Sequence, residues 1–408
     1  MARVFDVFSM HDRIMQEYRD YIRSHVSIRA DDIREAVEEE IEKGFYWPDP
    51  LLQFNPAFAP GGSVDELCDR GLFHPEIRRI FEDFQLFRHQ VDALELGCSG
   101  KDFVVTSGTG SGKSLTYLGT IFDHVLRQEV VNGVSGERGI RAVIVYPMNA
   151  LINSQKQALD DFAEQYKTTT GSDFPITYAR YTGQEDQTER DKIKEQLPHI
   201  LLTNYMMLEL LLTRHHEERL KFSIYKSLQF LVFDELHTYR GRQGADVAML
   251  IRRIRAAIEH DVVCIGTSAT MVSGGDEAQQ KKQVAAVASK VFGKSFEPDQ
   301  IIGETLAYSF ASTNEQNLDS EALRDALLQP IDMQAPHVVL EQHPISIWID
   351  RSISLTTETG HTSRRPPMTI TEIAELLAET SGVDLTTCRN QLEKFLLWTA
   401  EVNAAMAE

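Results

Sequence analysis

The chain has few cysteines and no long hydrophobic run. Its 408 residues include 4 cysteines, and no two of them form the Cys-x-x-Cys pair of a zinc or redox site. The most apolar run, at 200–212, is shorter than the about 20 residues that cross a bilayer. Residues 1–20 carry charges where a signal peptide needs an apolar stretch. We therefore expect no zinc site, no disulfide framework, no membrane partner and a reducing, cytoplasmic location.

A surplus of basic residues is also missing. The chain has 41 Lys and Arg against 61 Asp and Glu, which gives a net charge of −20. This acidity argues against strong nonspecific adhesion to polyanions. The charges within 81–275 are nearly balanced, so a local basic groove is compatible with the sequence there. Charge alone therefore neither proves nor excludes a nucleic-acid partner.

Short apolar runs alternate with helix-length segments in the middle of the chain. Five of these runs are apolar on both faces, as parallel strands covered by helices on both sides must be. They lie at 102–107, 142–147, 199–204, 230–235 and 262–268. The pattern predicts an α/β fold with a doubly wound parallel sheet, in which ligands bind beyond the carboxyl ends of the strands.

Composition predicts three regions. Residues 1–80 are expected to form a helical N-terminal extension that ends in a connector rich in proline and aromatic residues. Residues 81–275 form the α/β domain, and residues 276–408 form a mostly helical accessory or linker segment. In that segment, 370–398 looks like two helices around Gly382. They are either a DNA-reading helix-turn-helix or two packed connector helices, and the poorly basic second helix favours the connector.

A glycine-rich segment, TSGTGSGKS at 106–114, follows the first apolar run and precedes a helix-like stretch. In that position backbone N–H groups can wrap a phosphate, Lys113 can reach the β- and γ-phosphates, and Ser114 can bind Mg²⁺. Ser107 stands where the strict P-loop pattern has glycine. The candidate nucleotide-binding residues of this segment are Ser107, Gly108, Thr109, Gly110, Ser111, Gly112, Lys113 and Ser114.

Other polar residues also follow apolar runs. In LVFDELH, Asp234 could hold Mg²⁺ while Glu235 polarises the attacking water, which is the division of roles that phosphoryl transfer needs. In GTSATM, the hydroxyls of Ser268 and Thr270 could sense the γ-phosphate through that acidic pair. Gln90, in FRHQ, could read an adenine edge because its amide is both a donor and an acceptor.

These motifs occur in the order FRHQ, SGTGSGKS, YPMNALINSQ, TG, TN, DELH and SAT. The order resembles motifs Q, I, Ia, Ib, Ic, II and III of the first RecA-like domain of superfamily 2 DExH helicases. The longer string at 234–253 is similar to Hrq/MrfA-type DNA helicases and to large helicases of bacterial phage-defence systems. The resemblance covers about 81–271. It implies a P-loop, RecA-like fold that uses Mg-ATP hydrolysis to move on or unwind DNA, in DNA repair or antiviral defence.

The resemblance also implies roles for the residues that match. The implied catalytic residues are Lys113, Asp234, Glu235 and His237, and the implied Mg²⁺ ligands are Ser114 and Asp234. The residues that would couple the ATP and DNA states are His237, Ser268 and Thr270. The positions that would face single-stranded or forked DNA are Pro147, Asn149, Ala150, Gln155, Thr182, Gly183, Thr203 and Asn204. Short polar groups suit that task because they grip phosphates without reading bases. Each of them could instead be a cap or turn residue.

Two charged clusters allow more than one interpretation. RHHEER at 214–219 could suggest a metal site, but adjacent histidines point to different helix faces and the flanking charges favour solvent. RRIR at 252–255 places Arg252 and Arg255 on one helix face. We expect that face to be solvated or paired with acids, and a grip on DNA is the alternative.

The second half of such a helicase has no counterpart in the sequence. Unwinding needs a second RecA-like domain that closes over ATP and supplies arginine fingers, in a motif resembling QxxGRxGR. Nothing after residue 271 matches that motif. We therefore expect the N-terminal part of a larger helicase, or a subunit whose second half is encoded separately, with little or no ATP hydrolysis of its own. The alternatives are a nucleotide-dependent DNA- or partner-binding module without unwinding activity, and an RNA helicase.

Overall fold

The computed structural model describes residues 5–25, 28–42, 50–108, 110–132, 139–269, 277–310, 319–358 and 361–407. The chain divides into two compact units. One unit, called the sheet unit here, spans Phe58–Thr305. The other, called the split unit, is made of two separate chain segments, Met1–Ala57 and Leu306–Glu408.

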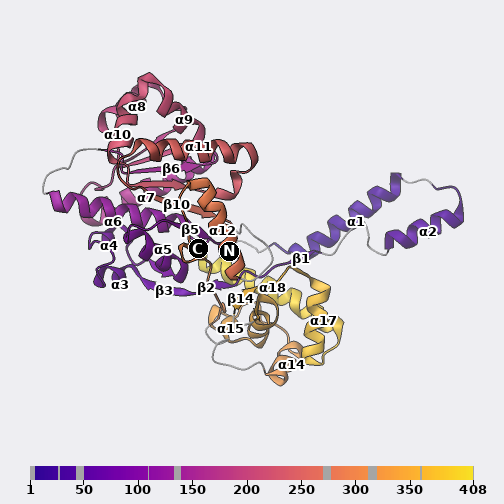
Figure 1. Ribbon diagram of the computed structural model, residues 1–408. Helices are drawn as coiled ribbons and strands as arrows, with labels where there is room; N and C mark the ends of the chain where they lie inside the picture. Colours follow the sequence, from indigo (N-terminus) through magenta and orange to yellow (C-terminus); the bar gives the residue numbers. More distant parts are fainter. Residues whose placement is uncertain are drawn as a thin grey trace. The chain divides into compact units, whose positions relative to one another are not determined.

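A seven-stranded parallel sheet forms the centre of the sheet unit (Figure 1). The strand order, with bounds, is β11 (Ile301–Gly303), β5 (Phe103–Thr106), β10 (Val263–Ser268), β9 (Phe230–Phe233), β6 (Ala142–Tyr146), β8 (Ile200–Asn204) and β7 (Tyr178–Tyr181). Five of these strands are the five predicted apolar runs, so the doubly wound α/β fold is confirmed. The edge strands β11 and β7 were not predicted. β11 has only three residues, and β7 is half-exposed along most of its length, so neither has the doubly buried pattern.

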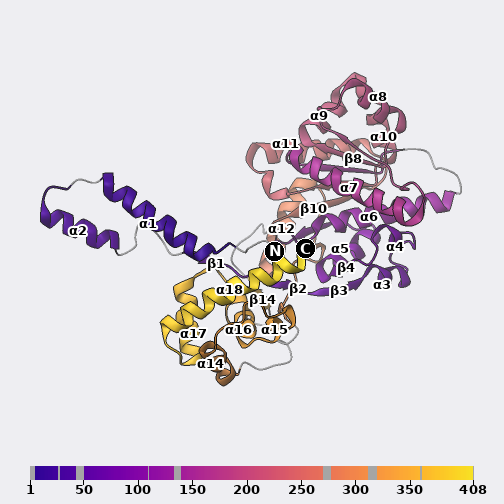
Figure 2. The same ribbon diagram turned by 180° about the vertical axis from the view of Figure 1, so that it is seen from behind.

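Helices cover both faces of this sheet (Figures 1 and 2). Successive strand residues point to opposite faces, so Phe103 and Val105 lie in one core and Val104 lies in the other. The first core takes its helical side chains from α5, α6 and α7, and the second from α9, α10, α11 and α12. The helix bounds are Arg88–Cys98 for α5, Lys113–Asn132 for α6, Asn149–Thr170 for α7, Tyr205–Thr213 for α9, Glu218–Ser227 for α10, Gly241–Ala257 for α11 and Glu277–Phe292 for α12.

The sheet unit is wider than the expected 81–275. At its start, α3 (Val64–Asp69) and α4 (Ile77–Ile80) bury apolar side chains in the same core as α5 to α7. At its end, α12 and β11 complete the second face and one sheet edge. The remaining elements are the antiparallel strands β3 (Pro60–Ser63) and β4 (Gln85–Phe87), helix α8 (Gln187–Gln196), and the 3₁₀ turns η1 (His215–Glu217), η2 (Leu236–Thr238) and η3 (Pro298–Gln300).

The arginine pair on α11 has a structural role that neither interpretation anticipated. Arg252 Nη2 donates to the carbonyl of Lys290 at 2.8 Å. Arg255 Nη1 donates to the carbonyls of Phe292 and Gly293 at 3.0 and 2.8 Å. These carbonyls belong to the C-terminal end of α12, where cations are stabilising. Arg252 is exposed, as expected for a solvated face, but both side chains bind backbone carbonyls and so cap a neighbouring helix.

The split unit is mostly helical, with one hairpin. Its helices are α1 (Val7–His25), α2 (Asp31–Glu42), α14 (Ser320–Leu328), α15 (His337–Gln342), α16 (Pro344–Ile349), the π turn η4 (Asp350–Ser354), α17 (Ile370–Ser381) and α18 (Leu385–Ala407). Its strands are β1 (Leu51–Leu52), which pairs with β15 (Met368–Thr369), the hairpin β13 (Leu355–Glu358) and β14 (His361–Arg364), and β12 (Leu306–Ala307). The short strand β2 (Ala57–Phe58) lies at the boundary of the two units.

The two helices expected within 370–398 are present as α17 and α18. Gly382 ends α17 with a left-handed φ of +69°, which glycine adopts without steric cost. Apolar residues of both helices, including Leu377, Leu392 and Trp398, are buried in the core of their own unit. This packing agrees with two packed helices rather than with a free DNA-reading helix. Among the helices that the structure describes, none is long and apolar enough to cross a membrane.

Candidate nucleotide site and nucleic-acid interface

The glycine-rich loop connects the end of β5 at Thr106 to the start of α6 at Lys113. Gly110 and Gly112 have φ of +80° and +68°, in the left-handed region that favours glycine. A Cβ on Gly112 would also clash with the side-chain amide of Gln90. The two glycines are therefore required by the turn between this strand and this helix.

Polar groups of the loop bind one another. The hydroxyls of Ser107 and Ser111 are buried and lie 2.6 Å apart. Lys113 Nζ donates to the carbonyls of Ser107 and Gly108, each at 3.0 Å, so its ammonium group folds back onto the loop. Thr109, also predicted for this site, lies outside the described residues.

A carboxylate that the sequence did not suggest binds the same loop. The backbone N–H of Gly108 donates to Glu304 Oε2 at 3.0 Å. Glu304 directly follows the edge strand β11, which pairs with β5. Backbone N–H groups of a P-loop are the donors that take phosphate oxygens. An anionic side chain therefore lies against a donor expected to serve the nucleotide.

Gln90 is buried against the loop. Its Oε1 accepts from the backbone N–H of Phe87 at 2.8 Å, and its Nε2 donates to the carbonyl of Gly112 at 3.1 Å. The neighbouring His89, which sequence reasoning missed, has Nε2 3.0 Å from the carbonyl of Ser111, and burial lowers its pKa. Both ends of the Gln90 amide are thus used within the protein, and contact with adenine stays a prediction.

The acidic pair is held by a threonine on the next strand. Thr267 Oγ1, on β10, donates to Asp234 Oδ1 and accepts from the backbone N–H of Glu235 at 3.2 Å. Glu235 has a left-handed φ of +53°, which is unusual for a residue with a side chain. Burial raises the pKa of Asp234, while the Thr267 hydrogen bond and the positive charge of Lys113 lower it in part. The structure therefore brings Lys113 of the P-loop and Asp234 into one electrostatic environment.

His237 connects this pair to the motif at the end of β10. Its Nδ1 lies 3.1 Å from Ser268 Oγ and 3.2 Å from Glu235 Oε2. Two of the three residues expected to couple the ATP and DNA states are therefore in contact. Thr270, the third, lies outside the described residues. Sequence reasoning missed Thr267, although it directly precedes the predicted Ser268.

Most of the residues expected to face nucleic acid lie where β6, β8 and β7 end, and these three strands are neighbours in the sheet. Gln155 lies further along α7, where its Oε1 accepts from the Tyr117 hydroxyl at 3.4 Å. Asn149, which begins α7 after β6, accepts at Oδ1 from Nδ2 of Asn204 at 2.8 Å. Asn204 Oδ1 also accepts from the backbone N–H of Met207 and so caps α9. The predicted positions that are at least partly exposed are Pro147, Asn149, Ala150, Gln155, Gly183 and Asn204.

Two of the predicted positions are turned inward. The Thr203 hydroxyl is fully buried and donates to the carbonyl of Tyr181 at 2.7 Å. Thr182 is nearly buried, and its N–H and hydroxyl both donate to the Glu185 carboxylate. Burial raises the pKa of Glu185, but the hydrogen bonds from Thr182 and Gly183 lower it more, so the net pKa lies below its usual value. The Thr203 side chain therefore joins the ends of β8 and β7, and the Thr182 side chain holds the loop that follows β7.

Three comparisons identify relatives of this arrangement. Residues 87–278 match the family model described as DEAD/DEAH box helicase. The uncharacterized ATP-dependent helicase YprA of Bacillus subtilis is 31% identical over 199 residues, which are 48% of this chain and 24% of YprA. Druantia protein DruE of Escherichia coli is 24% identical, over 71% of this chain and 22% of DruE.

A crystal structure of the DUF1998 helicase MrfA bound to DNA superposes with a TM-score of 0.50 and 24% sequence identity. The match covers 67% of this chain and 33% of MrfA, and it supports the RecA-like fold. The chain thus spans about a quarter of YprA, under a quarter of DruE and a third of MrfA.

Proposed function

We propose that this chain, whose residues 87–278 match the DEAD/DEAH box helicase model, supplies the ATP-binding half of an ATP-dependent DNA helicase or translocase of superfamily 2. The observation that carries the proposal is the junction of the P-loop with the acidic pair. The backbone N–H of Ser107 donates to the carbonyl of Ser268 at 3.2 Å, which joins the P-loop to β10, and Thr267 of that strand donates to Asp234. Nucleotide use is common to this family of ATP-dependent helicases.

The residues present suit Mg-ATP. Backbone N–H groups of 107–112 bind phosphate oxygens, and Lys113 leaves its loop carbonyls to contact the β- and γ-phosphates. The Ser114 hydroxyl and the Asp234 carboxylate are hard oxygen donors of the kind that Mg²⁺ prefers. When bound, Mg²⁺ offsets negative charge on the phosphates. Glu235 orients the attacking water and accepts its proton, and His237 holds the Glu235 carboxylate.

DNA is the proposed polymer substrate. The partly exposed polar groups at the ends of β6, β8 and β7 form a continuous row on the carboxyl edge, where ligands of such sheets bind. They offer short polar side chains, which suit phosphates better than bases. MrfA, which shares the fold, has been crystallised with DNA. A second RecA-like domain, in the same or a separate polypeptide, is the proposed partner that closes over the nucleotide.

We place this function in the cytoplasm, within DNA repair or antiviral defence. All four cysteines are free thiols. Burial raises the pKa of Cys98 and of Cys264 to about 12, which keeps these thiols protonated and unreactive. Such thiols suit a reducing compartment. The pathway rests on the resemblance of the 234–253 string to repair and phage-defence helicases.

The first test measures ATP binding and hydrolysis by this chain, with and without single-stranded DNA. We expect Mg-ATP binding with negligible turnover, because the arginine fingers come from the other half. Adding that half should give DNA-stimulated turnover that Glu235→Gln lowers by about 100-fold or more, since a general base contributes at least that much. Lys113→Ala should also lose ATP binding. The control is Lys101→Ala, an exposed lysine at the opposite end of β5.

Undiminished DNA-stimulated hydrolysis in Lys113→Ala or Glu235→Gln would falsify the proposal. Robust, DNA-stimulated turnover by this chain alone would contradict the split of functions between two halves. Mg-ATP binding without any DNA binding or unwinding, even with the second half present, would favour a nucleotide-dependent module for a protein partner. Preference for RNA over DNA of the same sequence would assign the chain to the RNA helicases.

A further inference from the structure

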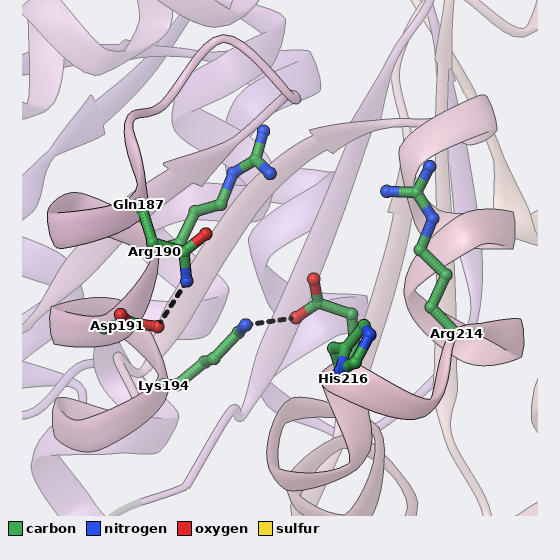
Figure 3. A pocket seen from close by; sticks show the side chains of 7 residues that line it. Gln187, Arg190, Asp191, Lys194, Arg214 and His216 are labelled. Atoms are coloured by element: carbon green, nitrogen blue, oxygen red, sulfur yellow. Dashed lines mark hydrogen bonds and ion pairs between the residues drawn. The ribbon is translucent and has the colours of Figure 1, made fainter.

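The RHHEER cluster, which the proposed function does not use, lines a hollow of about 600 Å³ at the β7 edge of the sheet unit (Figure 3). The hollow, called the α8 hollow here, lies between helix α8 and the turn that follows α9. Helix α8 contributes Arg190 and Lys194, and the turn contributes Arg214 and His216. Three basic and two acidic side chains line it, in a chain whose net charge is −20. The side chains that line the α8 hollow therefore carry a small positive charge, although the chain as a whole is acidic.

Two of the charged side chains in the hollow form an ion pair with each other. Lys194 Nζ lies 3.2 Å from Glu217 Oε2, and the two side chains are only 16% and 7% exposed. Asp191 accepts a hydrogen bond from the side-chain amide of Gln187 at 2.9 Å. Because Lys194 and Glu217 cancel each other's charge, Arg190 and Arg214 remain against the one carboxylate of Asp191, and the lining keeps a small positive charge.

Arg190 and Lys194 extend from α8 on one side of the hollow, and Arg214 extends from the opposite side (Figure 3). Arg214 is exposed, and its side chain has no hydrogen bond or ion pair with any residue that the structure describes. Arg190 is half-buried and donates from Nη2 to the carbonyl of Gly183 at 2.9 Å. Its Nε is buried and has no hydrogen-bond partner among the described residues. A buried donor without an acceptor is costly, so this group lacks the partner that its position demands.

The bond from Arg190 to Gly183 connects the hollow to the row of strand ends. Gly183 follows β7, the last strand of that row, and its N–H is held by Glu185. Helix α8 begins four residues later, at Gln187. A strand of nucleic acid that runs along the ends of β6, β8 and β7 would therefore reach Arg190 directly after Gly183.

We propose that the α8 hollow binds a backbone phosphate of that nucleic acid, held between the guanidinium groups of Arg190 and Arg214. This inference rests on the proposed function, because it extends the same DNA path beyond the sheet edge. Guanidinium groups bind phosphate oxygens through charge-assisted hydrogen bonds, and such contacts carry no base specificity. A metal ion is a poor occupant, since no metal-binding group of three His, Cys, Asp or Glu occurs in the described ranges.

The test compares Arg214→Ala with Lys192→Ala in the 408-residue chain. Lys192 is an exposed cation of α8 that does not line the hollow, so both variants lose one positive charge. Binding of a labelled single-stranded oligonucleotide is measured by fluorescence anisotropy over a series of salt concentrations. Arg214→Ala should weaken binding about tenfold, as loss of a charged hydrogen bond does. It should also lower the slope of log affinity against log salt by about 0.7. Arg214→Lys should restore most of the affinity, and Lys192→Ala should change it less than about twofold.

Mg-ATP binding, measured on the same samples, should be equal in all four proteins and shows that the variants are folded. Equal affinities and salt slopes for Arg214→Ala and Lys192→Ala would overturn the inference and leave the proposed function intact. A wild-type chain that binds Mg-ATP but no DNA would overturn both. Titration with inorganic phosphate separates a free anion from a nucleic acid. Phosphate binding that depends on Arg214, with DNA affinity indifferent to Arg214, would assign the hollow to a small anion and contradict the inference.

Discussion

The carboxyl edge of the central sheet has two halves that are built differently. Around β5, β10 and β9, polar groups bind one another: Lys113 folds onto loop carbonyls, Thr267 holds Asp234, and Glu304 accepts from a P-loop N–H. Around β6, β8 and β7, the polar groups are caps such as Asn204, partly open to solvent. The first half suits one small ligand of fixed shape. The second suits a polymer whose phosphates repeat, because each cap offers a weak and replaceable contact.

The difference also concerns how much each half must change to bind. At the nucleotide end, Lys113 and the N–H of Gly108 already have partners within the protein, so a nucleotide must displace them. At the far end, Arg214 and the Nε of Arg190 have no partner among the described residues. We therefore predict that substitutions at the nucleotide end will change ATP binding and turnover, and that substitutions at the far end will change the affinity for DNA.

Among the residues that only position other groups, the largest effect is expected from Thr267, which holds the acidic pair. Thr267→Val keeps the side-chain shape but removes the hydroxyl, so Asp234 and the Glu235 N–H lose a shared partner. In a preparation that contains the second half, ATP turnover should fall by about 10- to 100-fold, as the loss of a hydrogen bond to a charged group implies. Thr267→Ser keeps the hydroxyl and should retain turnover within about threefold.

The measurement that separates positioning from stability is Mg-ATP affinity together with the melting temperature. We expect Thr267→Val to bind Mg-ATP nearly as tightly as the wild type and to melt within a few degrees of it, while turnover falls. If turnover and melting temperature fall together, and serine does not rescue turnover, the threonine is only a packing residue. In that case the hydrogen bonds of Thr267 do not position Asp234 and Glu235 for ATP turnover.

A smaller effect, of opposite sign, is expected from Glu304. Its carboxylate accepts from the Gly108 N–H, a donor expected to serve a phosphate, and like charges about 4 Å apart cost about 1 kcal/mol in water. Glu304→Gln should therefore tighten Mg-ATP binding about fivefold. Asp299→Asn, an exposed acid in the turn before β11, removes the same charge away from the loop and should leave affinity unchanged. Equal tightening by both variants would point to net charge instead, and weaker binding by Glu304→Gln would make Glu304 part of the site.

The sequence predicts the five central strands of the sheet, but it does not predict the two edge strands. Strands β5, β6, β8, β9 and β10 are buried on both faces, so their apolar runs identify them and fix where the motifs fall. The edge strand β7 alternates between tyrosines and smaller or charged residues, and β11 is too short for any period to show. An edge strand has only one neighbouring strand. Its side chains are therefore less buried, and its sequence lacks the continuous apolar run that identifies a central strand.

The site residues that the sequence did not reveal depend on contacts between distant parts of the chain. Glu304 and Gly108 are 196 positions apart, and Thr267 and Asp234 are 33 apart, so no local pattern joins them. The P-loop and the acidic pair, in contrast, were identified because their chemistry requires a short run of residues. The buried positions of Thr182 and Thr203 could not be predicted either, because a threonine at a strand end serves as a cap as readily as it faces solvent.

The smallest effect should come from Thr203, and it tests the boundary between the two halves. The Thr203 hydroxyl is fully buried and donates to the Tyr181 carbonyl at 2.7 Å, so Thr203→Val should lower the free energy of unfolding by about 1 kcal/mol. Because valine leaves the surface unchanged, the affinity for single-stranded DNA should stay within about twofold.

Asn149→Ala removes a partly exposed amide at the end of β6 and should weaken DNA binding about threefold. Urea unfolding and anisotropy on the same samples measure both quantities. If Thr203→Val weakens DNA binding as much as Asn149→Ala does, the threonine acts in the interface, and the strand ends are coupled to DNA through their buried bonds.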